Sequence, residues 1–126
     1  MRKHIVIADD EEGVVETARL RLEANGYQVS TTMGAETVED VKKFKPDLIL
    51  LDVMMPGMDG YAIIRELKRD PNIANVPVIV FSAKPKGTIM ELFGPEGIAG
   101  YISKPYDPKE MLDLIKKVLG PWAPSI

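Results

Sequence analysis

Five polar side chains each follow a short apolar run, and together their types could bind a metal ion and a phosphoryl group. They are Asp9, Asp10, Asp52, Ser82 and Lys104. Three carboxylates held close together repel one another, so one would keep a proton at neutral pH unless a cation lay among them. An all-oxygen ligand set that keeps water favours Mg²⁺ or Mn²⁺ over zinc. A lysine and a hydroxyl beside such an ion form a site for an anion, and phosphoryl groups are the usual case.

Asp52 stands at the centre of the most informative stretch, Asp47 to Gly60, which reads DLILLDVMMPGMDG. The four apolar residues before Asp52 have no polar alternation, which is typical of a strand buried on both faces. Turn signals follow it at Pro56-Gly57 and Asp59-Gly60. Open α/β sheets bind ligands at the carboxyl ends of their strands, and a carboxylate there can attack phosphorus to form an acyl phosphate.

Each of these residues also has a purely structural interpretation. Asp52 could cap a turn or the next helix, and the pair Asp9-Asp10 could cap the first helix. Ser82 could be a turn residue, and Lys104 a solvated surface lysine. Each alternative is plausible alone, but the position of all five at strand ends in one short chain favours a common site.

The elements that must position these residues alternate between strand and helix patterns. Strands are predicted at 4–8, 27–31, 48–51, 76–81 and 101–103. Helices are predicted at 13–25, from 35 to about 45, and at 61–69, 88–93 and 108–119. This fivefold β-α alternation predicts an α/β fold with a doubly wound, five-stranded parallel sheet. The flavodoxin-like strand order 2-1-3-4-5 is the common solution, and it would bring all five polar residues to one edge.

Local signals define the ends of the last two helices. Gly94-Pro95 should end the fourth helix early, because proline cannot continue it without losing a hydrogen bond. Asp107, Pro108 and Glu110 form a strong helix start, with an N-cap acid, a proline at the first helical position and a second acid three residues after the cap.

Length and composition indicate one domain over residues 1–126, with residues 119–126 as a short C-terminal tail. The contents of 45% hydrophobic and 28% charged residues are typical of a globular protein, and the net charge of −3 argues against nucleic-acid binding through a basic surface. The absence of cysteine excludes disulfides and thiol chemistry. The first apolar run is too short for a signal peptide or a membrane span, so we expect a cytoplasmic protein with no membrane partner.

Four motifs together resemble the receiver domain of bacterial and archaeal response regulators, the proteins of two-component signalling. They are IVIADDE at the first strand, LILLDVMMPGMDGY at the third, VIVFSAK at the fourth and YISKPYD at the fifth. The resemblance covers nearly the whole chain and is closest to a stand-alone, chemotaxis-regulator-like receiver. The absence of an output domain would mean that signalling goes through another protein.

The resemblance implies a metal and phosphoacceptor site. Asp52 would be the phosphoacceptor, and Asp10, Asp52 and the backbone carbonyl of Met54 would bind Mg²⁺. Asp9 would reach the ion through a water molecule.

The resemblance also implies how the phosphoryl group is held and sensed. Lys104 would pair with the phosphoryl group and Ser82 would hydrogen-bond to it. Tyr101 would be the switch aromatic, which turns inward as Ser82 moves. The peptide between Lys104 and Pro105 would be cis, a state that only X-Pro bonds reach readily.

The implied function is a phosphorylation-activated switch. A histidine kinase or phosphotransfer protein would donate its phosphoryl group to Asp52 in a Mg²⁺-dependent step. The domain would catalyse its own phosphorylation and dephosphorylation and would turn over no substrate. A downstream protein would bind the face built from the fourth helix, the fifth strand and the fifth helix.

Two alternatives remain open. An aspartate-nucleophile phosphatase usually has a second acid two residues after the nucleophile, where this chain has Met54. A degenerate receiver acting only as an interaction module is disfavoured because every site position is filled. Met54 and Lys84 should flank the approach of water, and neither side chain activates water well, so the phosphorylated state should be long-lived. His4, the only histidine, lies in the first strand, and we expect it to be structural.

Overall fold

The computed structural model describes residues 2–120; Met1 and residues 121–126 are outside the described part. Five parallel strands form one sheet in the order β2-β1-β3-β4-β5, which confirms the predicted flavodoxin-like arrangement. The strands are β1 (His4–Ala8), β2 (Gln28–Thr32), β3 (Leu48–Leu51), β4 (Val78–Ser82) and β5 (Gly100–Ser103).

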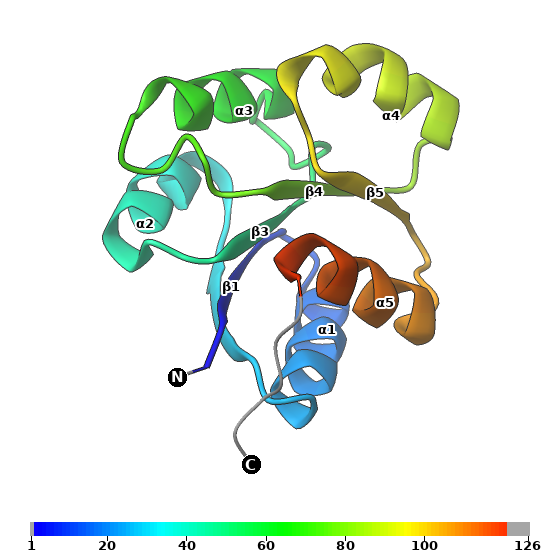
Figure 1. Ribbon diagram of the computed structural model, residues 1–126. Coiled ribbons are helices and arrows are strands. Elements are labelled where there is room, and N and C mark those ends of the chain that lie inside the picture. The colour runs from blue at the N-terminus through cyan, green and yellow to red at the C-terminus, as the bar shows by residue number, and fades with distance from the viewer. Residues whose placement is uncertain (1, 121–126) are drawn as a thin grey trace.

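Helices cover both faces of this sheet. They are α1 (Glu12–Ala24), α2 (Thr37–Phe44), α3 (Gly60–Arg69), α4 (Lys86–Phe93) and α5 (Pro108–Leu119), with short 3-10 helices η1 (Gly34–Glu36) and η2 (Gly94–Glu96). Figure 1 shows α1 and α5 on one face and α2, α3 and α4 on the other. In the part of the chain described, no helix is long and apolar enough to cross a membrane.

Strand β3 forms the centre of the core. All four of its residues are completely buried. Leu48 and Leu50 pack into the hydrophobic cluster with residues of α1 and α5, whereas Ile49 and Leu51 pack into the cluster with residues of α3. Burial on both faces accounts for the uninterrupted apolar run and places the following residue, Asp52, at the carboxyl edge of the sheet.

Carboxylates cap two of the helices; the cap of α5 was predicted, whereas Asp59 was predicted only as part of a turn. The carboxylate of Asp59 caps α3 by accepting a hydrogen bond from the backbone N–H of Tyr61 at 2.9 Å, and that of Asp107 caps α5 from Lys109 N–H at 2.9 Å. Helix α4 ends at Phe93, as Gly94-Pro95 predicts, but the chain continues directly into η2.

Several predicted boundaries differ from the structure by one or two residues, among them the starts of β4, of α4 and of the C-terminal tail. Strand β4 begins at Val78 rather than at residue 76, because Val76 donates its backbone N–H to the carbonyl of Ile73 and so closes a turn. Helix α4 begins at Lys86, two residues early, directly after the extended backbone of Pro85. Leu119 is the last residue of α5 and not part of a tail; the end of the predicted tail, 121–126, is outside the described residues.

Candidate functional site

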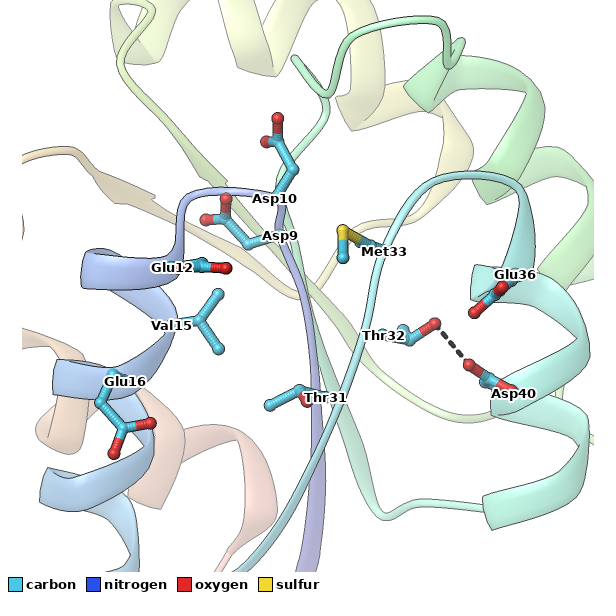
Figure 2. Close-up of a pocket in the computed structure, with 10 residues that line it drawn as sticks. All are labelled: Asp9, Asp10, Glu12, Val15, Glu16, Thr31, Thr32, Met33, Glu36 and Asp40. Atoms are coloured by element: carbon cyan, nitrogen blue, oxygen red, sulfur yellow. Dashed lines mark hydrogen bonds between the residues drawn. The ribbon is translucent and has the colours of Figure 1, made fainter.

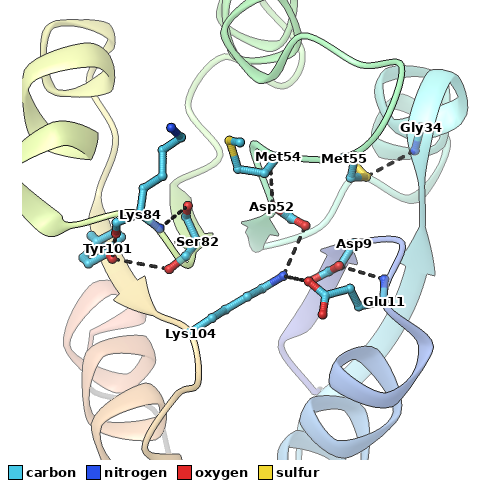
Figure 3. Close-up of polar contacts among 10 residues, drawn as sticks. All are labelled: Asp9, Glu11, Gly34, Asp52, Met54, Met55, Ser82, Lys84, Tyr101 and Lys104. Atoms are coloured by element: carbon cyan, nitrogen blue, oxygen red, sulfur yellow. Dashed lines mark hydrogen bonds and ion pairs between the residues drawn. The ribbon is translucent and has the colours of Figure 1, made fainter.

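Three of the predicted acids and the predicted lysine converge at the carboxyl edge of the sheet. Asp9, Asp10 and Asp52 each present a carboxylate oxygen, and these oxygens lie within 4.8 Å of one another. Lys104 Nζ lies 2.8 Å from Asp9 Oδ2 and 3.1 Å from Asp52 Oδ2, so it bridges the ends of β1 and β3 (Figure 3). The predicted convergence of these four side chains is present in the structure.

Burial and charge act on this cluster in opposite directions. Burial raises the pKa of the Asp9 carboxyl, and the nearby Asp52 charge adds to the rise, while hydrogen bonds from Lys104 and from the backbone of Glu11 oppose it. Burial alone would lower the pKa of Lys104, but its contacts with Asp9, Glu11 and Asp52 outweigh that effect and raise it above its ordinary value. The ammonium therefore stays charged beside the acids.

The two carboxylate oxygens of Asp52 have different partners. Oδ1 accepts a hydrogen bond from the backbone N–H of Met54 at 2.8 Å, so the turn-capping interpretation of Asp52 is correct for that oxygen. Oδ2 faces Lys104, and the side chain is only 4% exposed. The backbone turn thus fixes the orientation of the carboxylate and directs its second oxygen into the site.

The helix-capping alternative for Asp9-Asp10 is wrong. Glu11 is the N-cap of α1, and its side chain makes no capping hydrogen bond. Asp9 instead uses Oδ1 to accept a hydrogen bond from the backbone N–H of Glu11 at 2.9 Å. As in Asp52, one oxygen anchors the carboxylate to the following backbone and the other pairs with Lys104.

Glu11 is a site residue that the sequence analysis missed. Its Oε1 lies 2.9 Å from Lys104 Nζ, so it is a third acid on the lysine (Figure 3). It also lines a cavity of about 250 Å³ together with Asp10, Asp52 and Met54. The contact joins residues 93 positions apart, and no local spacing could have indicated it.

Ser82 and Tyr101 meet at the backbone of Lys84. Ser82 is fully buried, and its Oγ accepts a hydrogen bond from Lys84 N–H at 3.1 Å. The Tyr101 hydroxyl donates to the carbonyl of Lys84 and lies 3.3 Å from the carbonyl of Ser82. The structure thus connects the predicted switch pair through the β4–α4 loop. In the described residues, the hydroxyls of Ser82 and Tyr101 therefore hydrogen-bond to backbone atoms of Ser82 and Lys84. Lys104 instead pairs with the three acids.

Two further expectations concern the peptide bond after Lys104 and the only histidine, which lies far from the site. The Lys104–Pro105 peptide is cis, as the resemblance implies. His4 lies at the opposite end of β1 from Asp9, where its Nε2 is 2.7 Å from Ser30 Oγ and its ring packs edge-on against Phe44. These contacts agree with a structural role for the histidine.

A second, acidic cavity lies next to the cluster, between α1 and α2 (Figure 2). Its volume is about 470 Å³, and its acidic lining consists of Asp9, Asp10, Glu12, Glu16, Glu36 and Asp40. A concentration of negative charge of this kind attracts cations towards the edge of the sheet. In the described residues the central cluster is made of carboxylates only, which is the donor chemistry that Mg²⁺ prefers.

Comparison with known proteins shows the family. Residues 5–116 match the family model described as the response regulator receiver domain. The chain is 34% identical over 120 residues to the alkaline phosphatase synthesis transcriptional regulatory protein PhoP of Bacillus subtilis, covering 94% of this chain and 49% of PhoP. It is 32% identical over 117 residues to the DNA-binding response regulator MtrA of Mycobacterium leprae, covering 92% of this chain and 51% of MtrA.

Solved structures show the same fold. A response regulator from Chloroflexus aurantiacus superposes with a TM-score of 0.88 at 28% identity, covering 94% of this chain and 98% of that one. Chemotaxis protein CheY4 of Vibrio cholerae gives 0.87 at 22% identity, covering 94% and 99%. The receiver domain of sensor histidine kinase PA1611 from Pseudomonas aeruginosa, determined with a magnesium ion in its active-site cleft, gives 0.85 at 24% identity, covering 96% and 100%.

The lengths of the relatives bear on one expectation. The chain spans about half the length of PhoP and MtrA, and these two proteins are named as regulators of transcription or DNA binding. The comparisons therefore do not support the expectation that this chain has no nucleic-acid partner. At the level of the domain, the match over residues 5–116 is decisive: the chain belongs to the response regulator receiver domain family.

Proposed function

We propose that Asp52 is the phosphoacceptor of this receiver domain. Receiver domains are switches of two-component systems that interact with histidine kinases, and they are not turnover enzymes. The observation that carries the assignment is the orientation of Asp52, whose Oδ2 lies 3.1 Å from Lys104 Nζ, beside a cavity of about 250 Å³. Asp9 is the only other buried acid of the cluster, and it does not line that cavity.

The proposed reaction is a displacement at phosphorus that the domain itself promotes. An oxygen of Asp52 forms a bond to the phosphorus of a phosphohistidine on a histidine kinase or phosphotransfer protein. The P–N bond breaks, and its electron pair stays with the imidazole. Lys104, held by three acids in this structure, would pair with the phosphoryl oxygens, and Ser82 would hydrogen-bond to them. Hydrolysis of the acyl phosphate by water returns the domain to its starting state.

The acidic cluster fits Mg²⁺, with Mn²⁺ as a possible substitute, because its donors are oxygens and Asp10 remains accessible to water. We assign Asp10, Asp52 and the backbone carbonyl of Met54 as direct ligands, and Asp9 as a ligand through water. When bound, the ion neutralises the charge that develops on the transferred group. The carboxylates of Asp9 and Asp52 have a fixed orientation in the site, because one oxygen of each accepts a hydrogen bond from a backbone N–H.

The output would pass through the β4–α4 loop. Ser82, Lys84 and Tyr101 are already hydrogen-bonded to one another there, so a shift of Ser82 towards a phosphoryl group would change the partners of Tyr101. We propose that this shift biases a two-state equilibrium and alters the face formed by α4, β5 and α5, where a downstream protein binds. Residues 1–126 would act as one cytoplasmic receiver domain.

Substitution of the acceptor tests the assignment. Asp52→Asn should abolish phosphoryl uptake from acetyl phosphate with Mg²⁺, as measured by intact mass, while circular dichroism shows a native fold. Removal of one charge from the cluster relieves repulsion, so stability in metal-free buffer should hold or rise. Asp113→Asn, at an exposed ion pair on α5, is the matched control and should be phosphorylated like wild type. Stoichiometric uptake by the Asp52 variant would refute the assignment, and multiple turnover by wild type would favour a phosphatase.

A further inference from the structure

Glu11 shares Lys104 with the two buried acids of the site. Lys104 is 10% exposed and has three acidic partners, at 2.8 Å (Asp9), 2.9 Å (Glu11) and 3.1 Å (Asp52). Asp9 and Asp52 are anchored by backbone hydrogen bonds, whereas the Glu11 side chain is 58% exposed and reaches the ammonium from the rim of the site. Glu11 is therefore the partner that can leave Lys104 without exposing a buried charge.

A phosphoryl group on Asp52 would need both the space and the cation that Glu11 uses. Glu11, Asp52 and Lys104 line the same cavity of about 250 Å³. A phosphoryl group brings nearly two negative charges, and like charges a few ångströms apart repel each other. The Glu11 carboxylate cannot remain on Lys104 at full strength while that group pairs with the same ammonium.

We propose that Glu11 is a positioning residue that competes with the phosphoryl group for Lys104. It holds the ammonium in the unphosphorylated protein and must release it when Asp52 is phosphorylated. Glu11 thereby slows phosphorylation and weakens the phosphorylated state. This inference rests on the proposed role of Asp52 as phosphoacceptor.

The test compares Glu11→Gln with Glu12→Gln. Both changes remove one negative charge at the start of α1, but Glu12 is not among the three acids paired with Lys104. Each protein is phosphorylated with acetyl phosphate at saturating Mg²⁺, and Asp52 attacks phosphorus as acetate leaves with the electron pair of the broken P–O bond. The rate is followed by intact mass at low and high ionic strength. Affinity for beryllofluoride, a phosphoryl analogue, is measured in parallel.

We expect Glu11→Gln to raise the phosphorylation rate and the beryllofluoride affinity by about threefold to tenfold, the effect of one partly exposed charge close to the reacting group. Glu12→Gln should change both by less than about twofold. In metal-free protein, the NMR signal of the Lys104 ammonium should shift in the Glu11 variant and not in the Glu12 variant. That readout is independent of phosphorylation.

Three results would overturn the inference in distinguishable ways. If wild type is phosphorylated and Glu11→Gln reacts no faster than Glu12→Gln, Glu11 does not compete for Lys104 and the proposed function stands. If wild type acquires no phosphoryl group on Asp52, the proposed function and the inference fall together. A slower Glu11 variant would show that Glu11 assists Lys104, which is the opposite of the proposal.

Discussion

At the scale of single residues, the site depends on the different partners of the two oxygens of each buried carboxylate. Asp9 and Asp52 each use Oδ1 to accept a hydrogen bond from the backbone two residues later, at 2.9 and 2.8 Å. That bond restricts rotation of the carboxylate and leaves Oδ2 directed at Lys104. The hydrogen bond that forms the local turn therefore also orients the oxygen that faces Lys104. A side chain without two equivalent oxygens could not make both contacts.

Asp10 differs from the two buried acids because it is more accessible, and it should dominate metal affinity. Asp10→Ala should weaken Mg²⁺ binding by about tenfold or more, since even residues that only support ligands have effects of that size. Isothermal calorimetry or NMR titration gives the affinity. The only tryptophan, Trp122, is outside the described residues, so its fluorescence is not a suitable probe.

Glu12→Ala is the control for general electrostatic attraction, because Glu12 lines the neighbouring acidic cavity but not the three-carboxylate cluster. It should reduce Mg²⁺ affinity by less than about threefold. Equal losses in the two variants would remove Asp10 from the set of direct ligands.

The lifetime of the phosphorylated state should depend on Met54 and Lys84. Met54 is 53% exposed and lines the cavity beside Asp52 with a thioether, which is a weak acceptor and orients water poorly. The ammonium of Lys84 can only donate hydrogen bonds, so it cannot act as a base while charged. Met54→Asn and Lys84→Glu should each accelerate loss of the phosphoryl group, with the larger effect from Met54→Asn.

The decay is followed by intact mass after phosphorylation with acetyl phosphate and removal of the donor. Met54→Leu, which keeps the size and apolar character of the side chain, should decay like wild type. Decay that is unchanged or slower in both polar variants would show that these side chains do not control access of water to Asp52.

The sequence predicted the acids and Lys104 because each directly follows a strand, and parallel strands end at one edge. Glu11 lay outside that reasoning, although it is the next residue after Asp10. Its role depends on a side-chain conformation that reaches a lysine 93 positions away. Strand positions can be predicted from local patterns, but the choice of partner by a half-exposed side chain cannot.

At the scale of elements, the loop from β3 to α3 must place Asp52 while packing closely against the next helix. Gly60 is the first residue of α3, and a Cβ added there would lie 2.6 Å from Val53 Cβ and 2.7 Å from Val53 Cα. Because the contact involves backbone, it cannot be relieved by rotation of a side chain alone. Gly60→Ala should lower the free energy of unfolding by about 1–3 kcal/mol, as measured by urea denaturation.

Gly87→Ala in α4 is the matched control. A Cβ added at Gly87 meets nothing within 4 Å, and the residue is helical, so the change should stabilise the protein by about 0.4–1 kcal/mol. Opposite signs for the two glycines would support the close packing of Gly60 on Val53. A neutral Gly60→Ala would show that the loop can move away at little cost.

Element types were predicted more reliably than their boundaries. The interior of β3 and the cap of α5 have strong local signals, and these predictions are confirmed, whereas Asp59 was predicted only as part of a turn and is in fact the cap of α3. The end of α2 has a weaker signal, because its C-cap is Lys45 in the left-handed region at φ 48°, where glycine or asparagine is the usual residue. The early start of α4 likewise depends on the extended conformation of Pro85 and not on an apolar repeat.

At the scale of the whole molecule, two hydrophobic clusters lie on opposite faces of one sheet, and the polar site lies at its edge. The alternation of strand and helix patterns predicted a parallel sheet with helices on both faces, because each crossover must be right-handed. The strand order was predicted only as the common solution for five strands. The side-chain environment within each cluster was not predictable. Tyr27, for example, was predicted as the first residue of the second strand. It lies instead between α1 and β2, and its side chain is only 1% exposed.

The burial of Tyr27 should make the free energy of unfolding depend on pH in the alkaline range. Burial raises the pKa of the Tyr27 phenol above its ordinary value of 10.0, because the phenolate would lose its hydration. The folded protein therefore retains this proton to a higher pH than the unfolded chain does. The contribution to the free energy of unfolding is complete below pH 10 and is lost as the pH rises through the folded-state pKa. Lys104, whose pKa is also raised, acts in the same direction.

Above about pH 10, the free energy of unfolding of Tyr27→Phe should therefore decline less steeply with pH than that of wild type. The difference in slope is at most about 1.4 kcal/mol per pH unit, and it does not depend on the effect of the substitution at neutral pH. Urea denaturation at a series of pH values gives the slope. Ile79→Val, which removes a buried methylene group and no titrating group, should lower stability equally at every pH and leave the slope unchanged. If the Tyr27 variant declined as steeply as wild type, the loss of stability in alkali would come from groups other than this buried phenol.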